Sequence, residues 1–283
     1  MWMRPSLPPP QPHRVQVDSL RTHHSSSNTD RATRVPPVGG IRPLAIARVN
    51  RYAWSVTTNS QARELTEDVR LAVYYQLSAT GRAPTTRELA ATTAMPLDAV
   101  EQALRALHDH RDLVLGARGE ILMAHPFATI PLGFSVMGAR TLWWGGCAWD
   151  AFAIPHLVPG EASALVATTC PACERPHAFI VERDGPPIGS QVAHFLTPTS
   201  RIWDDVVNSC ANQRIFCGES CVEAWLEATA NQRGDVMDLA TLWRLARGWY
   251  RGRLERGYQR RVPVEAVEYF RQAGLSGPFW GLP

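Results

Sequence analysis

The residues of this chain best suited to chemistry are a cysteine and an aspartate among tryptophans, in the segment Trp143-Trp-Gly-Gly-Cys-Ala-Trp-Asp150. If a helix begins after Gly146, Cys147 and Asp150 lie three positions apart and their side chains adjoin on one face. A soft thiol beside a carboxylic acid in an apolar setting offers a metal ligand and a proton donor together. The simpler alternative is a small buried cysteine with Asp150 capping a turn, and the spacing alone favours this alternative.

The other cysteines are one isolated residue and two pairs. Cys210 stands alone after Asp205-Val-Val-Asn-Ser, where a structural role is the simplest interpretation. The pairs are Cys170 with Cys173, spaced as Cys-x-x-Cys, and Cys217 with Cys221. Two such pairs can close a tetrahedral zinc site, although the 43 residues between them exceed the usual zinc-ribbon spacing. Unpaired buried thiols are favoured over zinc here, and a redox pair is favoured least because a strand–Cys-x-x-Cys–helix order is missing.

The composition is that of a folded protein of one large domain or two ordinary ones. The chain has 283 residues, of which 45% are hydrophobic and 19% charged. No apolar run reaches the roughly 18 residues of a membrane-spanning helix, and residues 1–12 lack the apolar region of a signal peptide. We therefore expect a cytoplasmic protein whose cysteines are reduced. Phosphate-binding glycine loops and the nucleophile elbow of serine hydrolases are also absent from the sequence.

Four segments follow from the distribution of prolines, charges and apolar residues. Residues 1–60 are rich in Pro and Arg and are predicted to be a disordered leader. Residues 61–123 are predicted to form three helices and a hairpin, a winged-helix-like module. Residues 124–232 are predicted to be a thiol-bearing core of short strands, with 177–181 and 192–196 paired as a hairpin. Residues 233–283 are predicted to be a C-terminal helical extension.

Local signals place the helices of the winged-helix-like module. An apolar series from Leu65 to Leu77 predicts a helix that begins near Ala62 and stops at Gly81. Thr85 or Thr86 is predicted to cap a second, short helix through Ala91, with Glu88 placed for a capping box. Pro96 is predicted to begin a third helix.

The charge distribution argues against a nucleic-acid partner. Residues 1–61 hold eight Arg and two Asp, a net charge of +6, so the remainder carries −3 of the overall +3. The third helix of the module, which would enter the DNA groove, begins with Asp98 and Glu101, which repel phosphate. A packing role for the module is therefore favoured over DNA binding, which stays an alternative.

Taken together, these segments resemble the organomercurial (alkylmercury) lyase family. The resemblance runs from about Arg63 to Trp225. It joins the winged-helix-like start, the Cys-x-x-Asp of Cys147 and Asp150, the Cys and Pro turn of Cys170 to Pro176, and an Asp-Val…Ser…Cys…Phe block at Asp205 to Phe216. The C-terminal helical segment looks like the extension of a longer branch of the family. The resemblance implies an α+β fold, in which a winged-helix-like module packs on an antiparallel β/α core.

The resemblance also implies a reaction and the residues that carry it. Cys147 and Cys210 would bind mercury through two thiolates, and Asp150 would carry a thiol proton to the carbon that leaves mercury. The products would be a hydrocarbon and Hg(II), with no cofactor required for the chemistry. Cys170 falls on a family cysteine regarded as structural. Dry surroundings for the carboxyl group are expected from Trp143, Trp144 and Trp149.

The same resemblance implies partners, and departures from the family pattern keep alternatives open. The substrate would be a small organomercurial, and low-molecular-weight thiols or a mercuric reductase would take up the Hg(II). Ala211 stands where well-studied members often carry another cysteine, and Cys173, Cys217 and Cys221 are additional thiols that would bind zinc or compete for mercury. The alternatives are a non-catalytic thiol-rich metal-binding protein and a winged-helix metal-responsive regulator of the same family.

Overall fold

The computed structural model describes the chain from Arg51 to Pro283, and its side chains from Gln61 onward. The leader predicted for residues 1–60 thus lies outside the described residues, except for its last ten positions, where the first helix begins. Residues 50–283 form one compact unit. The divisions placed at residues 123 and 232 stay a prediction. No helix in the described part combines the length and apolar character needed to cross a bilayer.

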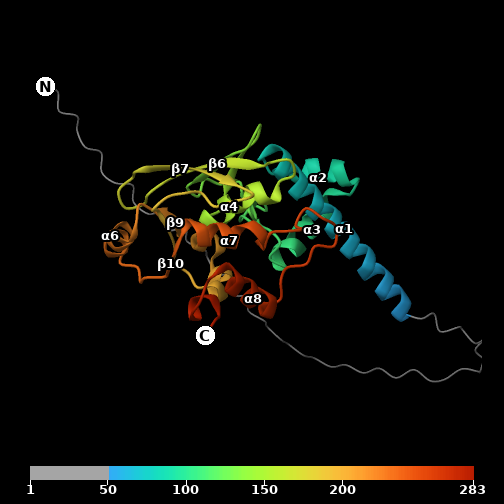
Figure 1. Cartoon of the computed structure of the whole chain (residues 1–283). Coiled ribbons are helices and arrows are strands. Elements are labelled where there is room, and N and C mark those ends of the chain that lie inside the picture. The colour runs from blue at the N-terminus through green and yellow to red at the C-terminus, as the bar shows by residue number, and fades with distance from the viewer. Residues whose placement is uncertain (1–50) are drawn as a thin grey trace, which may run out of the picture. The chain divides into compact units, whose positions relative to one another are not determined.

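Helices and antiparallel strands alternate along the described chain (Figure 1). The helices are α1 (Arg51–Thr80), α2 (Thr86–Thr93), α3 (Leu97–Asp109), α4 (Ala148–Leu157), α5 (Val206–Ala211), α6 (Glu219–Thr229), α7 (Leu239–Trp249) and α8 (Pro263–Ala273), with short 3-10 turns η1 (Thr199–Asp204) and η2 (Pro278–Trp280). The strands are β1 (Val114–Leu115), β2 (Ile121–Ala124), β3 (Phe127–Ala128), β4 (Phe134–Met137), β5 (Leu142–Gly145), β6 (Ser163–Thr169), β7 (Pro176–Glu182), β8 (Val192–Phe195), β9 (Gln213–Phe216) and β10 (Asp235–Asp238).

The strands form two antiparallel sheets. The larger sheet has the order β1-β2-β3-β5-β4-β6-β7 and the smaller one β10-β8-β9. The hairpin predicted between 177–181 and 192–196 is wrong, because β7 pairs with β6 while β8 is the central strand of the smaller sheet. The connection containing Asp184-Gly-Pro-Pro187 is too long for a tight hairpin turn. β7 also alternates between buried and exposed residues, as an edge strand covered on one face does.

The helices predicted near the N-terminus are present, with one difference in length. α1 begins at Arg51, ahead of the predicted start near Ala62, and ends at Thr80 before Gly81. α2 has the capping box predicted from Thr85 and Glu88, and α3 follows Pro96. β1 and β2 continue the larger sheet, so this hairpin is not a free-standing wing. A mixed fold of helices and antiparallel sheets is therefore established, while the winged-helix description stays a prediction.

A close contact ties α1 to the larger sheet. Gly81 has a φ of +68°, and a Cβ at this position would collide with the Leu142 carbonyl oxygen of β5. In the same region the Trp143 indole Nε1 donates hydrogen bonds to the carbonyl oxygens of Leu77 and Ser78, 2.9 and 3.1 Å away. The Ser78 carbonyl is one of those that the end of α1 leaves without a helical partner, whereas the Leu77 carbonyl also accepts the Gly81 N–H at 2.8 Å.

The centre of the molecule is α4, which contacts strands β4 to β6 of the larger sheet and lies against α7 (Figure 1). Residues 148–155 of this helix are all buried, as expected of a helix that is apolar on every side. Arg183 covers its C-terminal end, donating to the carbonyl oxygens of Pro155 and Val158 at 3.0 and 2.7 Å. Because both ends of α4 are fixed, the residues at its first turn have a rigid support.

Candidate active site

Cys147 and Asp150 lie at the N-terminus of α4, where the spacing predicts that they meet. Cys147 is the N-cap residue, and its Sγ accepts a hydrogen bond from the Asp150 backbone N–H at 3.4 Å. Both side chains are almost fully buried, with exposures of 2% and 1%. Gly146 leaves room for the carboxyl group, since a Cβ there would collide with Asp150 Oδ2. The thiol and the carboxyl group therefore share one buried corner.

Cys210 reaches the same corner from α5. Asp205 caps this short helix, and its carboxylate accepts the Asn208 N–H at 3.0 Å. Cys210 Sγ lies within 4.8 Å of a carboxylate oxygen of Asp150 and of a ring nitrogen of His125. Cys147 lines the same cavity as Cys210, and each thiol affects the pKa of the other. Two cysteines 63 positions apart thus meet beside one carboxyl group.

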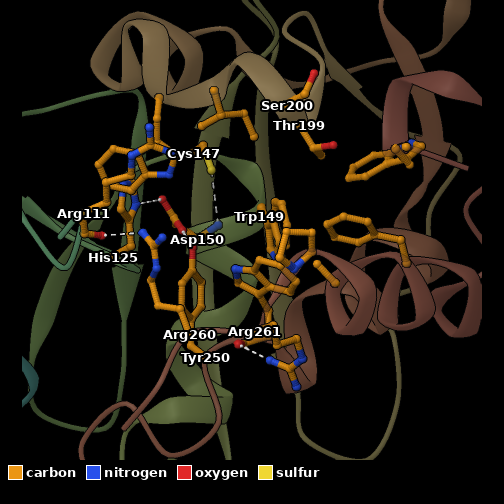
Figure 2. Close-up of a pocket in the computed structure, with 18 of the residues that line it drawn as sticks. Arg111, His125, Cys147, Trp149, Asp150, Thr199, Ser200, Tyr250, Arg260 and Arg261 are labelled. Atoms are coloured by element: carbon orange, nitrogen blue, oxygen red, sulfur yellow. Dashed lines mark hydrogen bonds and ion pairs between the residues drawn. The ribbon is translucent and has the colours of Figure 1, made fainter.

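Two further residues bind the carboxyl group of Asp150, and neither was found from the sequence (Figure 2). His125 Nδ1 lies 3.0 Å from Oδ2, and the Tyr250 hydroxyl donates a hydrogen bond to Oδ1. His125 is itself positioned by Arg253, which donates to its carbonyl oxygen at 2.9 Å. The residues are 25 and 100 positions away from Asp150, and no motif marks them. Only the tertiary fold reveals this arrangement.

The surroundings keep both thiols and the phenol protonated near neutral pH. Burial raises the pKa of Cys147 well above its usual value, and the neighbouring Cys210 thiol and the charge of Asp150 add to the effect. For Cys210 the neighbouring Cys147 thiol acts to lower the pKa, but burial and Asp150 together raise it. Burial and the charge of Asp150 also raise the pKa of Tyr250. The two thiols and the phenol therefore all carry a proton that they could donate within the site.

These groups open onto a cavity of about 510 Å³. One wall is aromatic: the Trp149 ring centroid lies 4.8 Å from that of Trp249, 6.0 Å from Phe270 and 6.2 Å from Trp280. Arginines also line the cavity, and Figure 2 labels Arg111, Arg260 and Arg261 among the lining residues. The cavity thus offers a soft metal site, an apolar wall and cationic groups.

The three tryptophans predicted to surround the carboxyl group have different positions. Trp149 lines the cavity. Trp143 is buried against the end of α1, and Trp144 is 38% exposed. Neither of these two residues lines the cavity. As neighbours in β5 they point to opposite faces of the sheet, and neither face presents its tryptophan to the cavity. The aromatic wall comes instead from α7, α8 and η2, which the sequence did not assign to the site.

The remaining four cysteines also come together, at a second place in the molecule. The sulfur atoms of Cys170, Cys173, Cys217 and Cys221 all lie within 4.8 Å of one another. This second cluster joins the two cysteine pairs that the sequence marks as a candidate zinc site.

The fold and the cavity define a class of protein: one of helices and antiparallel sheets in which two thiols and a carboxyl group meet at a single cavity. Residues 127–251 match the family model of alkylmercury lyase, MerB. This segment, somewhat under half of the chain, is thus similar to the alkylmercury lyase family. Cys147, Asp150, Cys210 and Tyr250 all lie within the matched segment, whereas His125 and α8 lie outside it.

Comparison with solved structures gives a similar chain described as the mercury-bound form of MerB2. Its sequence identity to this chain is 17%, and the TM-score is 0.49. The alignment covers 64% of this chain and 88% of that one. None of the curated proteins matches this sequence.

Proposed function

We propose that this protein cleaves carbon–mercury bonds by protonolysis, giving a hydrocarbon and Hg(II). The observation that carries the proposal is the meeting of Cys147, Cys210 and Asp150 in one buried cavity, within the segment that matches the alkylmercury lyase family. The second thiol and the carboxyl group are the two groups that this reaction requires. No organic or metal cofactor takes part in the reaction as proposed.

The proposed reaction begins with exchange of thiols on mercury. In an organomercurial R–Hg–SR′, the sulfur of one enzyme cysteine replaces the carrier thiolate on mercury, and the cysteine proton leaves with the carrier as R′SH. The second cysteine then binds mercury, and its proton passes through Asp150 to the carbon of R. The carbon–mercury bond breaks with its electron pair on carbon, so RH leaves and Hg(II) stays bound to Cys147 and Cys210. Mercury keeps its oxidation state throughout, and a soft two-thiolate product site suits Hg(II).

The cavity geometry supports a separate role for each group. The raised pKa of both thiols means that the protons needed for R′SH and RH arrive with the enzyme. Asp150 adjoins Cys147 within α4 and lies within 4.8 Å of Cys210 Sγ, so it is in place to move a proton. Tyr250 and His125 hold its two oxygens in orientation. Ala211 does not impair the proposal, since two thiolates are already present.

Removal of Hg(II) and the cellular setting complete the proposal. We propose that low-molecular-weight thiols or a mercuric reductase draw Hg(II) from the two cysteines, in the cytoplasm and as part of mercury resistance. The arginines that line the cavity suit carrier thiols that bear carboxylate groups. A winged-helix-like packing role for residues 61–123 belongs to the same proposal.

The test is a turnover assay with phenylmercury and methylmercury in excess thiol, with the hydrocarbon measured by gas chromatography. We expect Cys147→Ser and Cys210→Ser to lose hydrocarbon release. Asp150→Asn should retain stoichiometric mercury binding but release hydrocarbon at least about 100-fold more slowly, the range of a lost general acid. Asp184→Asn, at an exposed position, is the matched control and should keep the wild-type rate. Wild-type turnover by Asp150→Asn would refute the assigned proton path.

Measurements on the same purified protein distinguish the lyase from two alternative functions. A non-catalytic metal-binding relative would bind mercury without releasing hydrocarbon. A DNA-binding regulator would shift promoter DNA in a salt-sensitive manner. The acidic residues Asp98 and Glu101 at the start of α3 argue against the second alternative.

A further inference from the structure

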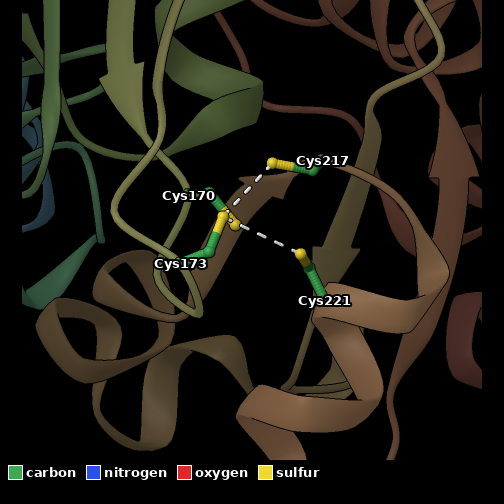
Figure 3. A group of neighbouring side chains, drawn as sticks. All are labelled: Cys170, Cys173, Cys217 and Cys221. Atoms are coloured by element: carbon green, nitrogen blue, oxygen red, sulfur yellow. Dashed lines mark hydrogen bonds between the residues drawn. The ribbon is translucent and has the colours of Figure 1, made fainter.

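The four cysteines outside the cavity have the spacing of a tetrahedral metal site (Figure 3). Their sulfur atoms all lie within 4.8 Å of one another, with Cys173 and Cys217 at 3.4 Å and Cys173 and Cys221 at 3.9 Å. Zinc–sulfur bonds of about 2.3 Å in a tetrahedron place neighbouring sulfurs about 3.8 Å apart. A disulfide would require about 2.05 Å, and all four thiols are free. The cluster is thus arranged around a central point.

The backbone around Cys170 is built to hold a thiolate. The backbone of Ala172, Cys173 and Cys217 lies near its sulfur. The turn is closed by hydrogen bonds of 2.9 Å from Cys170 N to the Arg175 carbonyl and from Glu174 N to the Cys170 carbonyl. Backbone N–H groups close to a sulfur stabilise negative charge there.

The same cluster lies where the two sheets need a connection. Cys170 and Cys173 belong to the turn between β6 and β7 of the larger sheet, whereas Cys217 follows β9, an edge strand of the smaller sheet. Cys221 comes from the first turn of α6. The apolar core at this end is small, with Cys170, Phe216, Val222 and Leu226 as its buried members. A bond network through a central ion would supply the cohesion that so small a core does not.

We propose that Cys170, Cys173, Cys217 and Cys221 bind one structural Zn²⁺ that joins the β6–β7 turn to the β9–α6 corner. Four protein ligands close the coordination sphere, which distinguishes a structural zinc site from a catalytic one with an open position. His177 Nε2, 3.7 Å from Cys217 Sγ, is placed as an outer partner of that ligand. Because β9 leads directly from α5, the ion would also steady the segment that carries Cys210.

Mercury is a weaker fit to this cluster than zinc. Four sulfurs at tetrahedral spacing satisfy Zn²⁺, while Hg(II) is satisfied by two thiolates in a linear arrangement. The buried pair Cys147 and Cys210 offers just two sulfurs. The chain would thus have two separate metal-binding sites: Cys147 and Cys210 for the substrate mercury, and the four-cysteine cluster for a structural ion. This inference does not depend on the proposed lyase activity.

The test is metal analysis of the full-length protein purified without chelator, compared with two double variants. We expect about one zinc per wild-type chain, and one per chain in Cys147→Ser/Cys210→Ser, the matched control that removes the other thiol pair. Cys173→Ser/Cys221→Ser should lose the zinc. Zinc retained in this variant but lost in the control would overturn the proposal, because the ion would then belong to the cavity. Iron in place of zinc would also overturn it.

A measurement on the wild-type protein keeps the proposal testable if the cluster variant does not fold. X-ray absorption at the zinc edge should give four sulfur neighbours at about 2.3 Å. Removal of zinc with a strong chelator should lower Tm by about 10 °C, and added Zn²⁺ should restore it. Nitrogen or oxygen neighbours, or a Tm indifferent to the chelator, would contradict a four-thiolate structural site.

Discussion

Asp150 must change its contacts during the proposed reaction, yet both of its oxygens are already engaged. The Tyr250 hydroxyl donates to Oδ1 and His125 Nδ1 adjoins Oδ2. Tyr250 stays protonated because burial and the charge of Asp150 raise its pKa. A fixed donor on Oδ1 restricts rotation of the carboxyl group and leaves the same oxygen facing the sulfurs in each turnover. Tyr250 thus acts as a positioning residue.

Tyr250→Phe should therefore lower kcat for hydrocarbon release by about 10- to 100-fold, since a hydrogen bond to a charged group contributes about 1.5–3 kcal/mol. Mercury binding, measured by thiol competition, should stay within about twofold of wild type because both sulfurs remain. Tyr75→Phe, at an exposed position, serves as the matched control. An unchanged kcat together with a lower Tm would assign Tyr250 a purely structural role.

At the scale of the secondary-structure element, α5 is the weakest support of the site. The helix spans only Val206–Ala211, and helices this short do not hold themselves together. Its N-cap, Asp205, accepts the Asn208 N–H, and the buried Val206 anchors its first turn. The position of Cys210 therefore depends on one capping interaction more directly than the position of Cys147 does.

Asp205→Ala should remove about 1 kcal/mol of stability and weaken binding of Hg(II), because α5 frays and Cys210 moves away from Cys147. Chemical denaturation and thiol competition measure the two effects. The neighbouring exposed Asp204→Ala breaks only a surface ion pair with Arg201 and should change little. Equal loss of mercury affinity in both variants would argue that the cap does not position Cys210.

The smaller sheet contains a buried histidine, and we expect this residue to make the free energy of unfolding of the protein depend on pH. Burial, helped by the charge of Arg233, lowers the pKa of His194 in β8 to about 4, and its Nε2 accepts the Gly234 N–H at 3.0 Å. In the unfolded chain the pKa would be near 6.5. The neutral form thus stabilises the fold above pH 6.5, and this contribution is lost as the pH falls towards 4.

We expect the free energy of unfolding to fall by roughly 2 to 3 kcal/mol more in wild type than in His194→Gln between pH 6.5 and pH 4. Glutamine keeps an acceptor for Gly234 but takes up no proton. Urea titrations at several pH values measure the difference, and the exposed His110→Gln provides the control. Parallel pH profiles for wild type and His194→Gln would show that this histidine is not the titrating group.

Contacts within one helix could be predicted from the sequence, whereas contacts between separate helices and strands could not. The capping box of Thr85 and the adjacency of Cys147 and Asp150 depend on helical spacing alone. Tyr250 and His125 come to the carboxyl group from other elements, and the partner of β8 was mistaken because pairing depends on the connection as well as on the strand pattern. The role of Cys210 came from resemblance to a family, since nothing around a lone cysteine marks its partner.

For the whole molecule, the C-terminal extension becomes part of the cavity. Trp249, Phe270 and Trp280 come from α7, α8 and η2, and all three line the same cavity as Trp149. Trp280 is also fixed through its Nε1, which donates to Asp235 Oδ2 at 3.0 Å. A stacked ring pair, Trp249 and Phe270 at 5.2 Å, continues this wall. Under the proposed function, residues 233–283 would therefore influence which organomercurials enter the cavity.

An aromatic wall should favour arylmercury substrates over methylmercury, because a phenyl group gains edge and face contacts of about 0.5–1.5 kcal/mol per ring pair. Phe270→Leu keeps an apolar residue but removes one ring, so kcat/KM for phenylmercury should fall about fivefold while that for methylmercury changes less than about twofold. Phe279→Leu removes a ring from the following turn, η2, at a residue that does not line the cavity, and is the matched control. Equal losses for both substrates in Phe270→Leu would mean that the wall supports the fold without selecting the organic group. A loss confined to phenylmercury would place substrate selection in the C-terminal extension.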